Sequence, residues 1–207
     1  YEKFSITANS SVSMNLYLAN TITSVEFAKS FHTYRVFLNS SKATKEEAER
    51  VSKHINIIRS IAKINFFAEV ISNSNFPKGA GIASSASGFA ALTVAASRAA
   101  GLKLSEKELS IIARLGSGSA CRSIPDGFVE WKEGSKSGDS YAHSLYKPDY
   151  WNIYDLIAVV EENSKKVSST EGHAIAESSP FYKTRIEGMK NQVKEILSEV
   201  ISAFNDA

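Results

Sequence analysis

Residues 77–89 read Pro-Lys-Gly-Ala-Gly-Ile-Ala-Ser-Ser-Ala-Ser-Gly-Phe, a segment that begins with proline and glycine and continues into small residues. Gly79 and Gly81 allow backbone angles that are closed to other residues, and they let a ligand approach closely. Ser84 and Ser85 lie where an alanine-rich helix is expected to begin, and the free N–H groups and dipole of a helix start attract an anion. The segment therefore predicts a phosphate-binding loop. The alternative is a stretch of small residues that packs helices closely without a ligand.

A second motif, Gly-Ser-Gly-Ser-Ala-Cys-Arg-Ser, occupies residues 116–123. Serine hydroxyl groups and backbone donors surround Arg122, whose guanidinium offers a fork of donors suited to phosphate or carboxylate. The motif therefore favours a second anion site over a flexible loop with a surface arginine. We expect Cys121 to be a small buried residue and not a nucleophile, because no histidine lies near it in the sequence.

The remaining polar motifs are weaker. Residues 165–170, Lys-Lys-Val-Ser-Ser-Thr, are read from the sequence alone as a solvated loop before the next helix. The four histidines lack metal-ligand spacing, so we assign no metal site to protein side chains alone: His32, His54, His143 and His173. A nucleotide would bring Mg²⁺ with its phosphates, and Ser84 or Ser85 could contact that ion.

Composition limits the class of protein. The chain has 207 residues, of which 43% are hydrophobic, enough for one large domain or two small ones. Its net charge of +2 does not indicate a nucleic-acid-binding protein. A single cysteine excludes an internal disulfide and makes the cytoplasm the expected location, and neither a membrane span nor a signal peptide is visible. The chain lacks Met at position 1 and begins within a strand-like pattern, so we expect a fragment or a processed chain.

Local patterns predict both strands and helices. Residues 4–18 read as extended structure with a polar break at 9–11. Period-two patterns predict an antiparallel meander over 21–27 and 33–38, followed by further strands at 65–72, 128–131 and 153–160. Helices are predicted after capping boxes at Thr44 and Ser105, over 90–100 with Gly101 as its stop, and from Pro180 onward.

Taken together, these motifs resemble the mevalonate diphosphate decarboxylases of the GHMP kinase superfamily. Residues 77–89 are similar to that family's ATP loop, Pro-x-x-Ala-Gly-Leu-Ala-Ser-Ser-Ala-x-Gly-Phe/Tyr. Residues 116–123 are similar to its substrate loop nearly residue for residue, and residues 127–131 continue the match. The Asn-Ser-Ser-Val-Ser segment at 9–13 and later landmarks between 150 and 179 also resemble the family, so the likeness runs the length of the chain. The substrate loop is the specific part, since the glycine loop alone indicates only the superfamily.

The resemblance implies an α+β fold that is GHMP-kinase-like. A nucleotide-binding domain like ribosomal protein S5 domain 2 is expected over residues 1–145, and the start of a ferredoxin-like domain over 146–207. It implies an ATP-dependent carboxy-lyase of isoprenoid biosynthesis that converts 5-diphosphomevalonate to isopentenyl diphosphate, ADP, phosphate and CO₂, with Mg²⁺ as cofactor. The family commonly forms homodimers. Substrate-binding positions are Ser117, Gly118, Ser119, Arg122 and Ser169, with Arg122 also catalytic. Nucleotide-binding positions are Gly79, Gly81, Ala83, Ser84, Ser85 and Ala86.

The chain also departs from the family pattern. The family's catalytic Asp-Ala-Gly-Pro-like motif and its Lys-Tyr-Trp-Gly-Lys-like segment are absent from the sequence. The family usually has Tyr/Phe-Gly-Gly-Phe where residues 124–128 read Ile-Pro-Asp-Gly-Phe, so an extra Pro125 and the Asp126 carboxylate lie beside the substrate loop. That carboxylate would repel a diphosphate unless it faces away or pairs with Arg122 or a lysine. These changes suggest a divergent, archaeal-type member. The alternatives are a paralogue acting on mevalonate 5-phosphate, a paralogue acting on the 3,5-bisphosphate without ATP, a mevalonate-type kinase, or a binding module without catalysis.

Overall fold

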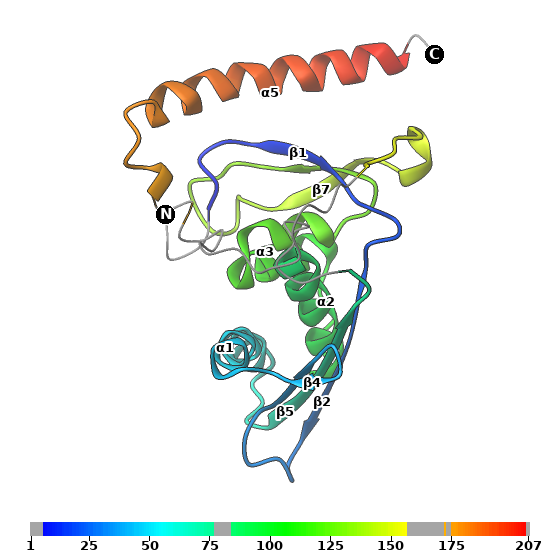
Figure 1. Cartoon of the computed structure of the whole chain (residues 1–207), viewed down its shortest axis with the longest axis vertical. Helices are drawn as coiled ribbons and strands as arrows, with labels where there is room; N and C mark the ends of the chain where they lie inside the picture. The colour runs from blue at the N-terminus through cyan, green and yellow to red at the C-terminus, as the bar shows by residue number, and fades with distance from the viewer. Residues whose placement is uncertain (1–5, 77–83, 157–171, 173–174, 206–207) are drawn as a thin grey trace.

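The computed structural model describes residues 6–76, 84–156, 172 and 175–205 (Figure 1). A mixed four-stranded sheet and an antiparallel three-stranded sheet lie at opposite ends of a group of helices (Figure 1). A long C-terminal helix lies across the three-stranded sheet (Figure 1). No helix among the described residues is long and apolar enough to cross a membrane.

The larger sheet has four strands in the order β2-β5-β3-β4: β2 (Thr21–Ala28), β5 (Phe67–Ser74), β3 (Arg35–Leu38) and β4 (Ser41–Lys42). The expected antiparallel meander of β2 and β3 is wrong, because β5 lies between them, antiparallel to β2 and parallel to β3. A parallel partner needs a long crossover connection, and the helix between β4 and β5 supplies it. Strand β4 was not predicted.

Both capping boxes are confirmed. The Thr44 hydroxyl accepts a hydrogen bond from the Glu47 N–H at the start of α1 (Lys45–Ala62), and the Glu47 carboxylate accepts one from the Thr44 N–H. Ser105 and Glu108 form the same pair before α3 (Glu106–Gly116). Each box satisfies two N–H groups that a helix start leaves without partners.

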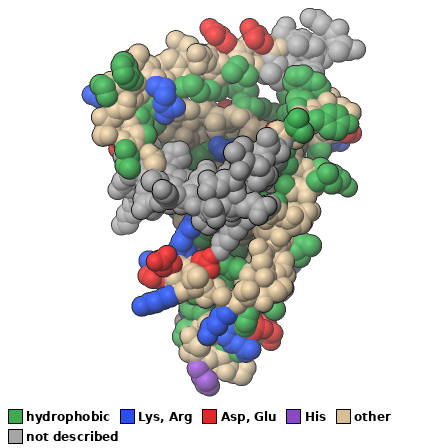
Figure 2. Space-filling model, viewed as in Figure 1, with side chains coloured by type: hydrophobic (Ala, Val, Ile, Leu, Met, Phe, Trp, Pro, Cys, Tyr) green, Lys and Arg blue, Asp and Glu red, His purple; other side chains and the backbone are tan. Residues whose placement is uncertain are grey.

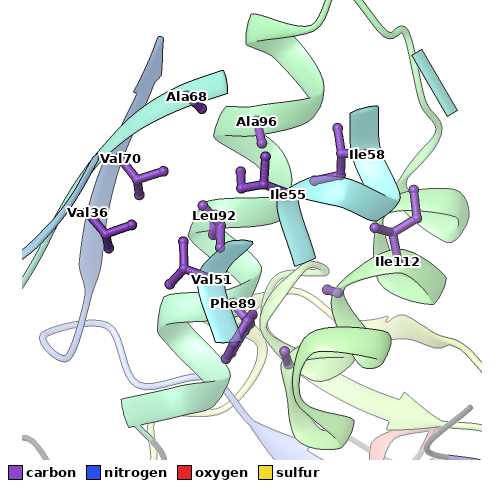
Figure 3. Close-up of a cluster of buried hydrophobic side chains, with 12 residues drawn as sticks. Val36, Val51, Ile55, Ile58, Ala68, Val70, Phe89, Leu92, Ala96 and Ile112 are labelled. Atoms are coloured by element: carbon purple, nitrogen blue, oxygen red, sulfur yellow. The ribbon is translucent and has the colours of Figure 1, made fainter. Parts of the chain in front are cut away.

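The central helix α2 (Ser84–Ala99) begins at the predicted serines and carries much of the core. Its small residues let α1, α3 and the large sheet approach closely, and Gly101 follows it with a φ of +76°, as expected of a helix stop. Figure 3 shows side chains of α1, α2 and α3 meeting those of the large sheet in one cluster. The most deeply buried hydrophobic members are Ile55, Ile58, Ala68, Val70, Ala96, Ala113 and Ala120.

One ionisable group lies within this core. His54 of α1 is 2% exposed and stands edge-on to the Phe89 ring, 5.3 Å between centroids. Its Nε2 lies 2.7 Å from the Thr93 hydroxyl oxygen, and that hydroxyl donates to the Phe89 carbonyl, so Nε2 carries the proton. Burial without a charged partner lowers the pKa of His54 to about 4.

We expect His54 to make folding stability depend on pH. Its folded pKa of about 4 lies below the ordinary value of 6.5, so the unfolded chain binds the proton more readily between these values. Stability from the neutral ring is present above pH 6.5 and is lost as the pH falls through 4, about 3 kcal/mol in all. Urea unfolding of wild type and His54→Gln, measured from neutral to acid pH, should show the difference between the two proteins shrinking on acidification.

The exposed His32 provides the control for this prediction. His32→Gln should leave the pH profile of unfolding that of the wild type. A His54→Gln profile parallel to the wild-type profile would contradict the assignment of a neutral buried ring.

The smaller sheet has three antiparallel strands in the order β1-β6-β7: β1 (Ser11–Met14), β6 (Phe128–Trp131) and β7 (Ala142–Tyr146). Strand β6 has its predicted bounds, whereas β7 was not predicted. Only residues 11–14 of the expected extended segment 4–18 form a strand, and Tyr17 and Leu18 beyond it are exposed; residues 1–5 lie outside the described part. Alternation over so short a stretch does not identify the residues that find a partner strand.

The C-terminal helix α5 (Tyr182–Asn205) follows Pro180 as predicted, and its Val193 is buried. The predicted buried strand over 153–160 is wrong for its described part: residues 153–156 lack regular structure, and Leu156 is 97% exposed. Figure 2 shows hydrophobic side chains at the surface beyond β7, at the upper right. An apolar run alone does not supply the partner strand that burial requires. The boundary expected at 145/146 falls at the end of β7 and stays a prediction.

Candidate functional site

The start of α2 opens onto a cavity of about 420 Å³ between α1, α2 and the large sheet. Apolar side chains from all three elements form its inner wall: Leu38, Val51, Val70, Phe89 and Leu92. Serine hydroxyls lie among its lining residues, Ser72 and Ser74 from β5 and Ser84 and Ser85 from α2. An apolar pocket with a few polar groups is typical of a small-molecule site.

The second predicted motif folds as the 3₁₀ helix η2 (Gly118–Ser123), which follows α3 directly. Arg122 projects from η2, and its Nη1 donates a hydrogen bond to the Ser11 hydroxyl of β1 at 3.0 Å. The guanidinium carbon also lies 5.3 Å from the centre of the Trp131 ring of β6. Within the described residues no carboxylate pairs with this half-buried cation. A partly buried charge is costly without a counterion, so Arg122 favours an anionic ligand.

The two motifs meet in space. The Ser85 hydroxyl oxygen at the start of α2 lies 3.4 Å from the Ser117 hydroxyl oxygen, which precedes η2. The first turn of a 16-residue helix, with its outward N–H groups, therefore adjoins the segment that bears Arg122. This arrangement can hold two anionic groups next to each other.

A buried serine of α3 holds the backbone next to Arg122. Ser110 of α3 is fully buried; its hydroxyl donates to the Cys121 carbonyl at 3.1 Å and accepts from the Ala142 N–H at 2.8 Å. One hydroxyl thus joins α3, η2 and β7. Cys121 is the buried residue that we expected: its Sγ–H donates to the Gly118 carbonyl, and burial raises the pKa of its thiol to about 12. A thiol with that pKa is not a nucleophile at neutral pH.

The unusual turn after η2 directs its carboxylate away from Arg122. Asp126 is exposed, and its Oδ1 accepts a hydrogen bond from the Gly127 N–H at 2.8 Å. Pro125 is fully buried, and its carbonyl accepts from the Asn15 side-chain amide at 2.7 Å. The Asp126 carboxylate therefore stabilises the turn through this hydrogen bond. The alternative in which Asp126 pairs with Arg122 is not observed.

Seven of the predicted site residues lie in the described part of the chain, at the two adjoining motifs: Ser84, Ser85, Ala86, Ser117, Gly118, Ser119 and Arg122. Ala86 is buried in α2, so only its backbone can contact a ligand there. The other four, Gly79, Gly81, Ala83 and Ser169, lie outside the described residues, as does the 165–170 motif.

Sequence reasoning assigned no role to the residues that hold Arg122 in place. Ser11 and Trp131 contact its guanidinium, and Ser110 fixes the adjacent carbonyl. The signal for two of them was present, since Ser11 and Trp131 both belong to segments that carried the family resemblance.

In the part of the chain that the structure describes, no three His, Cys, Asp or Glu side chains are grouped to hold a metal ion. Hydroxyl oxygens are the ligand type that Mg²⁺ accepts alongside phosphate oxygens and water, and Ser84 and Ser85 supply them at the cavity. The donor set therefore fits an ion that arrives with a phosphate ligand.

Comparison with known proteins identifies the family of the chain. Residues 2–142 match the family model described as diphosphomevalonate decarboxylase-like N-terminal domain. A diphosphomevalonate decarboxylase of Ganoderma lucidum is 37% identical over 204 residues, covering 89% of this chain and 51% of that protein. The chain thus spans about half the length of the curated relatives it matches.

Solved structures give the same result. The mevalonate diphosphate decarboxylase of Staphylococcus aureus superposes with a TM-score of 0.86 at 35% identity, covering 100% of this chain and 62% of that one. A structure of MDDEF in complex with MVAPP, AMPPCP and magnesium superposes with a TM-score of 0.84 at 35% identity, covering 99% and 62%. The expected α+β fold is therefore confirmed.

Proposed function

The chain belongs to the family of diphosphomevalonate decarboxylase-like N-terminal domains, and on that premise we propose that it binds nucleotide and substrate in an ATP-dependent mevalonate diphosphate decarboxylase. ATP phosphorylates the tertiary 3-hydroxyl of the substrate and leaves as ADP, after which phosphate and CO₂ leave to give isopentenyl diphosphate. The observation that carries the proposal is the contact between Ser85 and Ser117, which joins the nucleotide loop to the segment of Arg122.

The nucleotide half is the cavity beside α2. Its apolar wall, with Phe89 and Val70, suits the base, and its serine rim suits the phosphates. Ser84 and Ser85 present N–H groups at a helix start and hydroxyls to the phosphate chain. When bound, ATP supplies the phosphoryl group and Mg²⁺ neutralises its phosphates, and Ser84 or Ser85 would hold that ion. The relative bound to AMPPCP and magnesium supports this assignment.

The substrate half is η2 with the residues before it. Arg122 binds an anionic group of the substrate through the donors that Ser11 does not occupy, and Ser117, Gly118 and Ser119 bind beside it. Phosphoryl transfer depends mostly on position and on neutralising charge, so this half orients the 3-hydroxyl toward the nucleotide and lowers the repulsion between the two anions. Ser169, outside the described residues, is proposed as a further contact because of the family resemblance.

Activity measurements test this proposal. Full-length protein, supplied with ATP and Mg²⁺, should release CO₂ and ADP in equal amounts with mevalonate 5-diphosphate and little with other mevalonate phosphates; turnover is measured on the full-length protein because the family's catalytic Asp-containing motif is absent from these 207 residues. Isothermal titration should also show binding of ATP with Mg²⁺ and of mevalonate diphosphate to the chain. The chain spans only part of its relatives, so binding and turnover are measured separately.

The outcomes separate the alternatives. CO₂ released from the 3,5-bisphosphate without ADP would identify a decarboxylase that does not use ATP, and preference for the 5-phosphate would identify a different substrate. ADP without CO₂ would identify a kinase. A protein that binds neither nucleotide nor any mevalonate phosphate would overturn the proposal in favour of a module without catalysis.

Two lesser proposals follow from the same family. A cytoplasmic location suits the buried free thiol of Cys121, and fractionation of source cells would test it. A homodimer is proposed from the resemblance, and light scattering during size-exclusion chromatography would measure it.

A further inference from the structure

The Arg122 guanidinium contacts two residues that face each other on neighbouring strands. Ser11 of β1 and Trp131 of β6 are direct cross-strand partners in the small sheet. The Ser11 hydroxyl accepts a hydrogen bond from Nη1 of Arg122 at 3.0 Å, and the Trp131 ring centre lies 5.3 Å from its guanidinium carbon. One strand pair therefore offers a polar contact and an aromatic contact to the same cation.

The Trp131 ring is itself fixed in place. Its Nε1–H donates to the Ser140 hydroxyl oxygen at 2.9 Å, and that hydroxyl donates onward to the Lys132 carbonyl at 3.0 Å. Ser140 is completely buried, and Trp131 is 9% exposed beside Cys121 and Val129. The indole thus has one orientation, determined by a hydrogen bond on its edge and by packing on its faces.

A guanidinium benefits from such support because its donors lie in one plane. Bidentate binding of a phosphate or carboxylate requires that plane to contain the anion's oxygens. A free arginine side chain samples many rotamers and loses that freedom on binding, whereas a supported one has already lost it.

We propose that Trp131, held by Ser140, is a positioning residue that sets the guanidinium plane of Arg122 for binding the substrate anion. This inference rests on the proposed function only in the identity of that anion. In this proposal Trp131 acts through its contact with Arg122.

Binding measurements on the full chain test the inference. Trp131→Leu should weaken binding of mevalonate diphosphate about 10-fold, and Trp131→Phe, which keeps an aromatic face, about 3-fold. Ser140→Ala keeps the indole ring but removes the hydrogen bond that orients it, and it should weaken binding of mevalonate diphosphate about 3-fold. The affinity for ATP with Mg²⁺ should stay that of the wild type, which also shows that the variants fold. Trp151→Leu, at the other and more exposed tryptophan, is the matched control and should bind as the wild type does.

A double-mutant cycle distinguishes positioning from general loss of structure. In an Arg122→Gln background, Trp131→Leu should have no further effect on binding of mevalonate diphosphate. Equal losses in both backgrounds would overturn the inference, as would Trp131→Leu binding with wild-type affinity.

A second measurement needs no substrate. The indole ring current should shift the Arg122 Nε–Hε signal in a ¹H–¹⁵N spectrum, assigned by its absence in Arg122→Lys. That signal should move in Trp131→Leu and Ser140→Ala and stay in place in Trp151→Leu. A signal that does not move in these variants overturns the inference, whether or not the wild type binds mevalonate diphosphate. Failure of the wild type to bind mevalonate diphosphate overturns the proposed function instead.

Discussion

Arg122→Lys is expected to weaken binding of mevalonate diphosphate about 100-fold and to lower kcat/KM at least as much. Lysine keeps the positive charge but replaces a planar fork with a single ammonium group. The Nη1 bond to Ser11 and the contact with the Trp131 ring are both made by the guanidinium, so a lysine at this position would lose the fixed orientation as well as the fork of donors. Titration of the purified variant with mevalonate diphosphate, alongside CO₂ release, measures the two effects.

The affinity for ATP with Mg²⁺ serves as the internal control, because Arg122 is proposed to belong to the substrate half of the site. Arg98, exposed in the last turn of α2, supplies the matched substitution, and Arg98→Lys should bind and turn over substrate as the wild type does. If Arg122→Lys retained wild-type affinity for mevalonate diphosphate, Arg122 would be only a nearby charge, and the assignment of η2 as the anion site would fall.

The features that were predicted correctly depend on interactions within a few residues. Thr44 with Glu47 and Ser105 with Glu108 are three residues apart, so both helix starts follow from local hydrogen bonding. Gly101 ends α2 because a left-handed residue is needed there and glycine adopts that conformation without strain. No distant part of the chain competes with these choices.

Pairing between distant segments was not predictable in the same way. Period two identified β2 and β3 as strands, but the pattern is equally compatible with β2 beside β3 and with β5 between them. The structure pairs Thr21 with Ser74 and Thr23 with Ser72, joined by their hydroxyls on one face. The two members of each pair are about 50 residues apart in the sequence, with the helix α1 between them. Their pairing therefore depends on the fold and not on local sequence.

The site shows the same division. The motifs at 84–86 and 117–122 were identified because each is compact in sequence. The Ser11 contact with Arg122 joins residues 111 positions apart, and nothing in either segment alone indicates it. A local chemical pattern thus identifies the candidate binding group, whereas the residues that contact and orient that group come from the fold.

Gly127→Ala is expected to destabilise the protein by about 3 kcal/mol, more than the same substitution at Gly101 or Gly138. Gly127 has a φ of +76°, and a Cβ at this position would lie 2.2 Å from the Tyr146 carbonyl oxygen and 2.8 Å from the Lys147 carbonyl carbon. Both are backbone atoms of β7 and the residue after it, so relief requires the β6–β7 pair to separate. Urea unfolding, followed by tryptophan fluorescence, measures the loss of stability.

The two other glycines separate the causes. Gly138 has open space around it and no positive φ, so Gly138→Ala should change stability by less than about 0.5 kcal/mol. Gly101 has the same φ of +76° with nothing within 4 Å of a Cβ, so Gly101→Ala should cost about 1 kcal/mol from backbone strain alone. The excess of Gly127→Ala over Gly101→Ala then measures the close approach of β7. If the two variants were equally stable, the close approach of the Tyr146 and Lys147 backbone would add nothing to the backbone strain at Gly127, and the steric part of the prediction would be wrong.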